Sequence, residues 1–263
     1  CCATASASPR EGIDFLPLSV DFEEKLYSVG RIPGSWNRRE GRPSEKAILA
    51  SRVIDRPIRP RFPKDLRNDV VLSLTVMSVD PDCSPEITGM IGASIALSIS
   101  DIPWNGPIAG LFMGCVDGEI VTNPTADQRE RSTLELTVAS SADKVVMIEA
   151  GAKEIPDDVM FSAIMKAHEE TKPIIEFINS IVAEIGKPKF EYPSCEVDKE
   201  LYERIAALVT EDVKVALDTD DKKVRDARLK PIYDKVYEAF GEEYPDSKGM
   251  MDECLYKLQK SIV

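Results

Sequence analysis

Histidine is nearly absent from this sequence, and cysteine occurs in no metal-binding pattern. The 263 residues include one histidine, His168, and six cysteines, none of them in a C-x-x-C spacing. Zinc sites and disulfide frameworks need clusters of these residues, so the sequence supports neither. We interpret the cysteines as free thiols in a reducing compartment, which favours the cytoplasm.

Long hydrophobic runs are also missing. No stretch approaches the about 20 consecutive apolar residues that a membrane-spanning helix requires, and no signal-peptide pattern opens the chain. At 43% hydrophobic residues the chain can still bury a large core. We therefore expect a folded protein without a membrane partner. Because the chain opens on Cys-Cys-Ala-Thr-Ala, a composition typical of a buried strand, we also expect it to be N-terminally truncated, starting inside a larger domain.

The chain has no overall positive charge, since its formal net charge is −13. Positive charge is concentrated in residues 31–67, which hold nine of the fifteen arginines and two lysines against four acidic residues. This segment carries 11 − 4 = +7, and the remainder carries −13 − 7 = −20. A basic island on an acidic body indicates a local polyanion site and excludes a wholly basic nucleic-acid coat.

The order of predicted elements indicates an α+β region followed by a helical one. Alternating or apolar segments predict strands in 12–28 and 69–79, and in the pairs around Asp117-Gly118 and the Ser-Ser-Ala-Asp turn. Small residues of the predicted helix 89–100 should let it approach a sheet closely. After residue 155 the pattern stays helical to 187. We predict domains at 1–186 and 199–263, the latter with about three helices, joined by a linker at 187–198.

The basic segment contains a helix-compatible run from Glu45 to Asp55. Its apolar residues, which we expect to face inward, are Ile48, Val53 and Ile54. Arg52, Arg56 and Arg59 follow at i, i+4 and i+7, which is one helix face if the helix continues through Pro57.

Arginine side chains suit phosphate because the planar guanidinium donates two parallel hydrogen bonds and stays charged. Trp36 and Asn37, beside Arg38 and Arg39, add a stacking surface and an amide, as in proteins that bind a single strand. Composition alone leaves a second interpretation open, in which these residues form a solvated charged face paired with the acidic body.

Four stretches resemble the polynucleotide phosphorylase family in the same order. They are "GRIPGSWNRREGRPSE", "SRVIDRPIRPRFP", "MIGASIALSISDIPWNGPIAG" and "NPTADQRERSTLELTVAS". The resemblance implies a ribonuclease PH-like core over residues 1 to about 186, with the mixed sheets and packed helices of the ribosomal protein S5 domain 2-like type. It implies a small all-α domain thereafter.

The resemblance also implies an activity. Members of this family degrade single-stranded RNA from its 3′ end: inorganic phosphate, the co-substrate, attacks the terminal linkage and nucleoside diphosphates are released. It implies a cytoplasmic homotrimer, Mg²⁺ bound by a second core outside these residues, and helicase and endoribonuclease partners in RNA-degradation complexes. The alternative is a non-enzymatic RNA-binding or scaffold subunit of an exosome-like ring.

The family's channel loop, Phe-Phe-Arg-Arg, corresponds to Trp36, Asn37, Arg38 and Arg39. One aromatic residue is kept and the other is replaced by Asn37. The RNA-binding residues that we predict are Trp36, Asn37, Arg38, Arg39, Arg42, Arg52, Arg56 and Arg59.

The expected phosphate-binding and catalytic positions depart from the family's second core. Where that core has a Ser-rich phosphate loop, this chain has Cys-Ser-Pro-Glu at 83–86, and a glutamate there repels phosphate. Its two catalytic aspartates and lysine align with Arg129, Glu135 and Thr137. Glu135 is therefore a weak catalytic candidate, and we expect this chain alone to be inactive.

Three other residues carry little signal for chemistry. Asp80 and Asp82 flank a proline at a strand end, where turn formation is the better interpretation than a carboxylate pair. His168 lies in a helical segment without neighbouring metal ligands, so we expect packing or exposure. No metal site is predicted in this chain.

Overall fold

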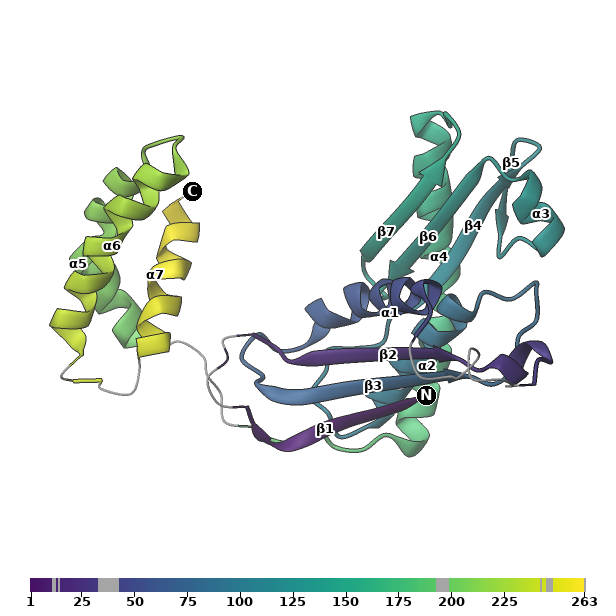
Figure 1. The fold of residues 1–263 in the computed structure, drawn as a ribbon, viewed down its shortest axis with the longest axis horizontal. Helices are drawn as coiled ribbons and strands as arrows, with labels where there is room; N and C mark the ends of the chain where they lie inside the picture. Colours follow the sequence, from purple (N-terminus) through teal and green to yellow (C-terminus); the bar gives the residue numbers. More distant parts are fainter. Residues whose placement is uncertain are drawn as a thin grey trace. The chain divides into compact units, whose positions relative to one another are not determined.

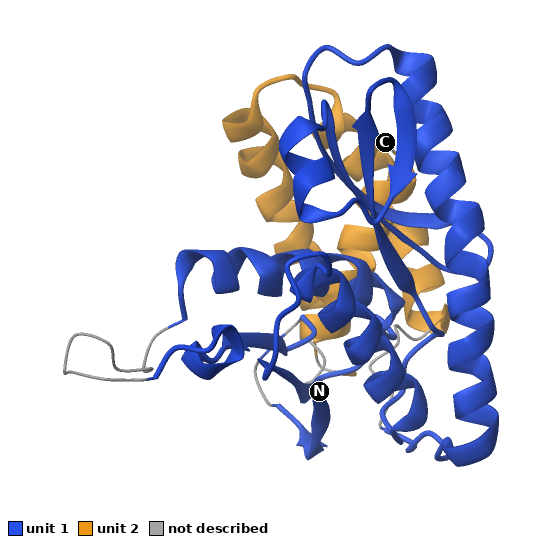
Figure 2. Ribbon diagram, turned by 90° about the vertical axis from the view of Figure 1, so that its right-hand side faces the viewer, with its two compact units in different colours: residues 1–192 blue, residues 193–263 orange. Residues whose placement is uncertain are grey.

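The computed structural model describes the chain except residues 11–12, 14, 33–42, 193–198, 242, 245–247 and 263. It divides into two compact units, residues 1–192 and 193–263 (Figure 2), each with its own hydrophobic core. The division falls inside the segment 187–198, which the sequence predicts as a linker. Among the described residues, no helix combines the length and the apolarity needed to cross a membrane.

A three-stranded mixed sheet forms one layer of the first unit (Figure 1). Its strands are β1 (Cys2–Pro9), β2 (Leu18–Glu24) and β3 (Asn68–Val76), in the spatial order β1-β3-β2. The central strand β3 runs antiparallel to β1 and parallel to β2. Its alternate residues Val70, Leu72 and Leu74 are at most 3% exposed, as the period of two predicts. The opening cysteines do lead into a strand, but the prediction that it is buried is wrong, because Cys1 and Cys2 are exposed.

Helix α1 (Glu45–Ile58) begins at Ser44, whose Oγ accepts a hydrogen bond from the Ala47 N–H at 3.1 Å. Pro57 is accommodated in the last turn, so the helix does continue through it. Ile54 is fully buried, whereas Ile48 is 46% exposed, and the prediction that Ile48 faces inward is wrong. Six residues correspond to about 240° around a helix, which turns Ile48 away from the face of Ile54.

Helix α2 (Pro85–Ile99) lies close to the sheet at its small residues. A Cβ atom on Gly89 would lie 3.2 Å from side-chain atoms of Ile54, Leu74 and Phe22. Ala93, one turn further on, is fully buried. The small-residue stripe thus permits the close approach that the sequence predicts.

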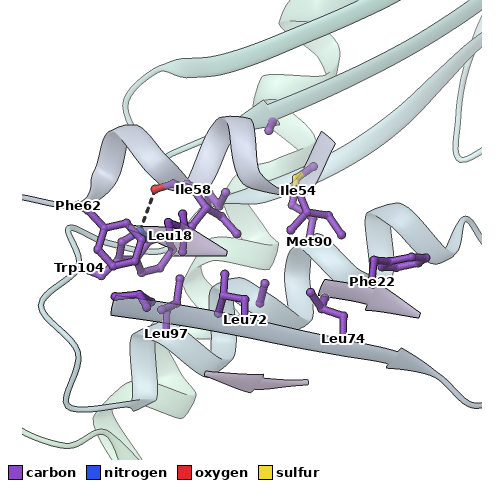
Figure 3. Packing of buried hydrophobic residues seen from close by; sticks show 14 of the residues in the cluster. Leu18, Phe22, Ile54, Ile58, Phe62, Leu72, Leu74, Met90, Leu97 and Trp104 are labelled. Atoms are coloured by element: carbon purple, nitrogen blue, oxygen red, sulfur yellow. Dashed lines mark hydrogen bonds between the residues drawn. The ribbon is translucent and has the colours of Figure 1, made fainter. Parts of the chain in front are cut away.

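The core of the first unit lies between this sheet, α1 and α2 (Figure 3). The rings of Phe62 and Trp104 are 6.4 Å apart. Trp104 Nε1 donates a hydrogen bond to the Ile58 carbonyl at 3.1 Å, drawn as the dashed line in Figure 3. This bond joins the loop after α2 to the end of α1.

A four-stranded antiparallel sheet forms the other part of the first unit, in the order β5-β4-β6-β7 (Figure 1). The strands are β4 (Ala109–Val116), β5 (Glu119–Thr122), β6 (Leu134–Ser140) and β7 (Val145–Ala152), with the short helix α3 (Ala126–Arg131) before β6. Asp117 and Gly118 have φ of 52° and 86°, which confirms the predicted hairpin. Helix α4 (Asp157–Ile185) packs on one face through Ala163 and Ala167.

Residues 186–192 are fixed to the first unit. Lys189 Nζ donates to three carbonyls at the end of α2, at 2.9, 3.1 and 2.7 Å: those of Leu97, Ser98 and Ser100. Tyr192 Oη donates to Asp65 Oδ1 at 2.9 Å, and the Tyr192 ring packs against the core. Half of the predicted linker is therefore part of the α+β unit.

The described residues of the second unit form three helices, as predicted: α5 (Lys199–Leu217), α6 (Lys222–Phe240) and α7 (Lys248–Ile262). Arg204 on α5 donates two hydrogen bonds to the Glu243 carboxylate, at 2.9 and 2.7 Å. The same guanidinium lies over the Phe240 ring, 5.0 Å from its centroid. These contacts join the start of α5 to the end of α6.

Candidate nucleic-acid interface

The predicted RNA-binding residues fall into two groups. Five of them lie outside the described residues, and their role stays a prediction: Trp36, Asn37, Arg38, Arg39 and Arg42. The other three belong to α1 or directly follow it: Arg52, Arg56 and Arg59. The structure gives these three arginines very different surroundings.

Arg59 is bound on several sides by the protein itself. Its Nε and Nη2 each lie 2.9 Å from an oxygen of the Asp55 carboxylate. Its Nη1 and Nη2 also donate to the carbonyls of Leu16 and Leu18, at 3.1 and 3.0 Å. A guanidinium has five N–H donors, so few remain for a ligand. Arg59 thus joins the end of α1 to the start of β2.

Arg56 has a single and more accessible partner. Its Nη1 donates to Glu149 Oε2 on β7 at 2.9 Å. The two side chains are 56% and 50% exposed. Such exposed ion pairs contribute little to stability, about 0–1 kcal/mol.

Arg52 is exposed one turn before Arg56 and has no ion pair or hydrogen bond with any described residue. Its guanidinium can therefore bind a phosphate without losing a partner in the described structure. Of the three arginines that the sequence predicts on one helix face, Arg52 has no described partner and Arg56 has one exposed partner. Arg59 is held by four hydrogen bonds.

An open groove of about 1720 Å³ borders the basic segment. Its walls come from β2, the start of α1, the start of α3 and residues 79–86. Ile32 and Pro43, the two residues that directly flank 33–42, both line it. The described residues on both sides of 33–42 therefore belong to the groove.

Most cationic groups of this groove have partners within it. Lys46 Nζ lies 3.6 Å from Glu24 and 4.0 Å from Glu86. Arg129 donates a short hydrogen bond to the Pro81 carbonyl. Arg31 lines the groove, is exposed and has no ion pair with a described residue. Among the described residues of the groove, Arg31 is therefore a cation that a ligand can reach without displacing an ion-pair partner.

The start of α2 is closed to anions. Ser84 Oγ accepts from the Ile87 N–H at 3.4 Å and donates to Glu86 Oε2 at 2.6 Å. Pro85 removes one of the N–H donors that a helix N-terminus offers. A capped end that carries a carboxylate does not attract phosphate.

Arg129 holds the wall of the groove in place. Its bond to Pro81 is accompanied by a second one nearby, in which the Ala126 N–H donates to Asp82 Oδ1 at 2.8 Å. Together they attach Pro81 and Asp82 to α3. At the position of Arg129, where the resemblance leads us to expect the counterpart of a catalytic aspartate, the side chain has a structural contact.

Glu135 and Thr137 lie on β6, on the face of the sheet opposite α4. Glu135 is exposed between Gly114 and Gly151, and no hydrogen bond or ion pair joins it to another described residue. Thr137 is half-buried between Phe112 and Glu149. The aligned positions therefore form no hydrogen-bonded catalytic cluster.

The described histidine, cysteine and acidic side chains do not form a metal site either. Within the described ranges, no three histidine, cysteine or acidic side chains lie close enough together to hold one. Mg²⁺, which the resemblance implies, finds no ligand set among these residues.

The remaining candidates have structural roles. Asp80 Oδ1 accepts from the Asp82 N–H at 3.0 Å, and that is the turn that the sequence predicts. His168 is buried in α4, in agreement with a packing role.

Sequence patterns missed Glu149 and Lys46. Both are single acidic or basic residues whose partners lie far along the chain, and only the alternation of β7 could have indicated the face on which Glu149 lies.

Three family models match this chain. "3' exoribonuclease family, domain 1" matches residues 1–103 and "3' exoribonuclease family, domain 2" matches 106–170. "Polyribonucleotide nucleotidyltransferase, RNA binding domain" matches residues 200–263. In a comparison of structures, rice (Oryza sativa) Rrp46 aligns with a TM-score of 0.55 over 69% of this chain and 82% of its own, at 12% identity. That likeness concerns the fold alone.

Curated relatives named polyribonucleotide nucleotidyltransferase align over nearly the whole chain. The protein of Ruminiclostridium cellulolyticum is 55% identical over 261 residues, which are 99% of this chain and 37% of that protein. The protein of Lachnoclostridium phytofermentans is 56% identical over 262 residues, again 99% of this chain and 38% of its own. This chain spans little more than a third of these relatives. It belongs to the polyribonucleotide nucleotidyltransferase family, and its first unit has the ribonuclease PH-like fold.

Proposed function

We propose that this chain is the RNA-gripping part of a polyribonucleotide nucleotidyltransferase that degrades single-stranded RNA from its 3′ end. The observation that carries the proposal is the net charge of +7 of the basic segment 31–67, whose described residues Arg31, Ile32 and Pro43 line an open groove. The relatives' name supports the reaction, and the arginines support only a polyanion site.

The proposed reaction is phosphorolysis. An oxygen of inorganic phosphate attacks the phosphorus of the terminal linkage, and the bond from that phosphorus to the 3′ oxygen of the preceding nucleotide breaks. The terminal nucleotide leaves as a nucleoside diphosphate, and the RNA is shortened by one; the reverse reaction polymerises diphosphates. In this chain Arg38, Arg39, Arg42, Arg52 and Arg56 hold the RNA backbone and Trp36 stacks on a base. The Arg59 contacts favour a structural role for that residue.

The complete enzyme in this proposal is a cytoplasmic homotrimer with Mg²⁺ in a second core outside this chain. Helicase and endoribonuclease partners belong to the same proposal. This core is non-catalytic in it, since Glu86 and Pro85 occupy the expected phosphate loop and no described partner orients Glu135.

A second candidate function is a scaffold subunit of an exosome-like ring, which binds RNA without any reaction in the complete protein. The capped and acidic start of α2 favours it, because the same feature would remain if no active core accompanied this one.

Phosphate-dependent release of nucleoside diphosphates from 3′-labelled single-stranded RNA tests the proposal. The chain and the product of its complete reading frame are compared, each with and without Arg38→Ala and Arg39→Ala. We expect activity only in the complete protein, with weaker RNA binding in the variants. Diphosphate release by this chain alone would refute the assignment of chemistry to another core. An inactive complete protein would favour the scaffold.

A further inference from the structure

We propose that Glu149 is an internal competitor for RNA at Arg56: it occupies the guanidinium when RNA is absent, and an RNA phosphate displaces it. The inference rests on the proposed function, namely RNA binding along α1. It concerns the regulation of that surface.

The geometry of the pair permits exchange. One guanidinium nitrogen, Nη1, contacts one carboxylate oxygen at 2.9 Å, and no further bond holds Arg56 to the described residues. Both side chains are about half exposed, so water and salt reach them. A phosphate offers the same guanidinium two parallel hydrogen bonds where Glu149 uses one.

The neighbouring arginines Arg52 and Arg59 differ from Arg56 in the partners that RNA would have to displace. Arg59 makes four hydrogen bonds to Asp55 and to two carbonyls, and its Asp55 partner is only 23% exposed. A phosphate would have to replace all of these at once. Arg52 has no described partner to displace. Of these three arginines, only Arg56 pairs with an exposed carboxylate that RNA can replace.

Glu149 reaches Arg56 from a different sheet. It lies on β7, opposite Thr137 of β6, whereas α1 packs on the sheet of β2 and β3. The pair therefore joins α1 to β7, and its opening by RNA would release this contact. Glu149 is 93 residues from Arg56 in the sequence, and strand β7 holds its carboxylate beside the guanidinium.

Fluorescence anisotropy of a labelled single-stranded RNA, measured with the 263-residue chain over a range of salt concentrations, tests the competition. Glu149→Gln should bind RNA about 1.5- to 5-fold more tightly than the wild type at low salt, the range expected for an exposed ion pair. This gain should shrink as salt rises, because salt also screens the exposed ion pair that competes with RNA in the wild type.

Two controls separate competition from a general change of charge. Glu119→Gln removes the same charge from an exposed residue of β5 that has no ion pair with a described residue. In an Arg56→Gln background, Glu149→Gln should improve binding no more than Glu119→Gln does. Circular dichroism checks that each variant is folded.

The outcomes distinguish this inference from the proposed function. If the chain binds RNA but Glu149→Gln and Glu119→Gln have equal affinities, the competition is overturned and the proposed function stands. A gain that persists without Arg56 overturns it as well. A chain that binds no RNA overturns both.

Discussion

At the scale of single residues, the availability of an arginine depends on how many of its donors the protein already uses. Arg59 uses four hydrogen bonds within the first unit, and Arg52 uses none with a described residue. Spacing placed both on one helix face correctly. It could not reveal the partners, because the Leu16 carbonyl lies 43 residues from Arg59 in the chain and Glu149 lies 93 from Arg56.

Arg59→Gln should therefore reduce stability, whereas Arg52→Gln should reduce RNA binding. Arg59→Gln removes the guanidinium bonds to the Asp55 carboxylate and to the Leu16 and Leu18 carbonyls, and we expect the free energy of unfolding to fall by about 1–3 kcal/mol. Arg52→Gln should change it by no more than about 0.5 kcal/mol, while weakening RNA binding. Urea titration and RNA anisotropy on both variants measure the two effects. Equal stabilities would contradict the structural role of Arg59.

At the scale of elements, the end of α2 depends on a residue 89 positions or more away in the chain. Lys189 Nζ supplies donors to three carbonyls at the end of α2, where a helix lacks backbone N–H partners. Desolvation lowers the pKa of Lys189, with the Asp101 carboxylate acting in the opposite direction. The helix end therefore contains a cation whose only close bonds in the described structure are to carbonyl oxygens.

Lys189→Met should destabilise the C-terminal end of α2. It keeps most of the apolar side chain and removes the donors, so we expect a loss of about 1–3 kcal/mol in unfolding free energy and faster amide exchange near residues 99–101. Lys187→Met is the matched control, because the Lys187 side chain is exposed and only its backbone bonds to α2. Hydrogen exchange measured by mass spectrometry compares the two. Equal exchange rates at the end of α2 would count against the role of Lys189.

Elements with strong periodicity or a defined turn could be predicted from the sequence. Residues 69–76 of β3, the Asp117-Gly118 hairpin and the long helix α4 are confirmed. The sequence predicts segment 187–192 as linker because its hydrophobic residues do not recur with the spacing of a helix or a strand. Its attachment to the first unit comes from single side chains, Lys189 and Tyr192, whose partners no local pattern indicates. For the site, the sequence located the basic segment but could not tell free arginines from occupied ones.

At the scale of the whole molecule, charge separates the basic segment from the rest of the chain. Residues 31–67 carry +7 and the remainder carries −20. RNA should be repelled by the acidic body and concentrated at the basic segment, with both effects weakening as salt rises.

The second unit should show its own acid sensitivity. The hydrogen bonds from Arg204 lower the pKa of Glu243 below its ordinary value of 4.5. A carboxyl group whose pKa is lower in the folded state stabilises the fold above its unfolded pKa, and this stabilisation is lost as pH falls through the folded pKa. Glu243→Gln should therefore speed amide exchange in α5 at neutral pH, and the difference from wild type should vanish in acid below that folded pKa. Glu238→Gln, an exposed residue of α6 without a described ion pair, is the control. A difference that persists in acid would contradict the assignment.

The most direct test of the central claim is the salt dependence of single-stranded RNA binding by the chain and its Arg38→Ala/Arg39→Ala variant. Arg10→Ala, outside the basic segment, is the control. If these arginines hold RNA phosphates, the double variant should bind more weakly and its log–log salt slope should be shallower by about 1.4, two single-strand phosphate contacts, with Arg10→Ala unchanged. Identical slopes and affinities for the chain and the double variant would contradict the claim that Arg38 and Arg39 hold RNA phosphates.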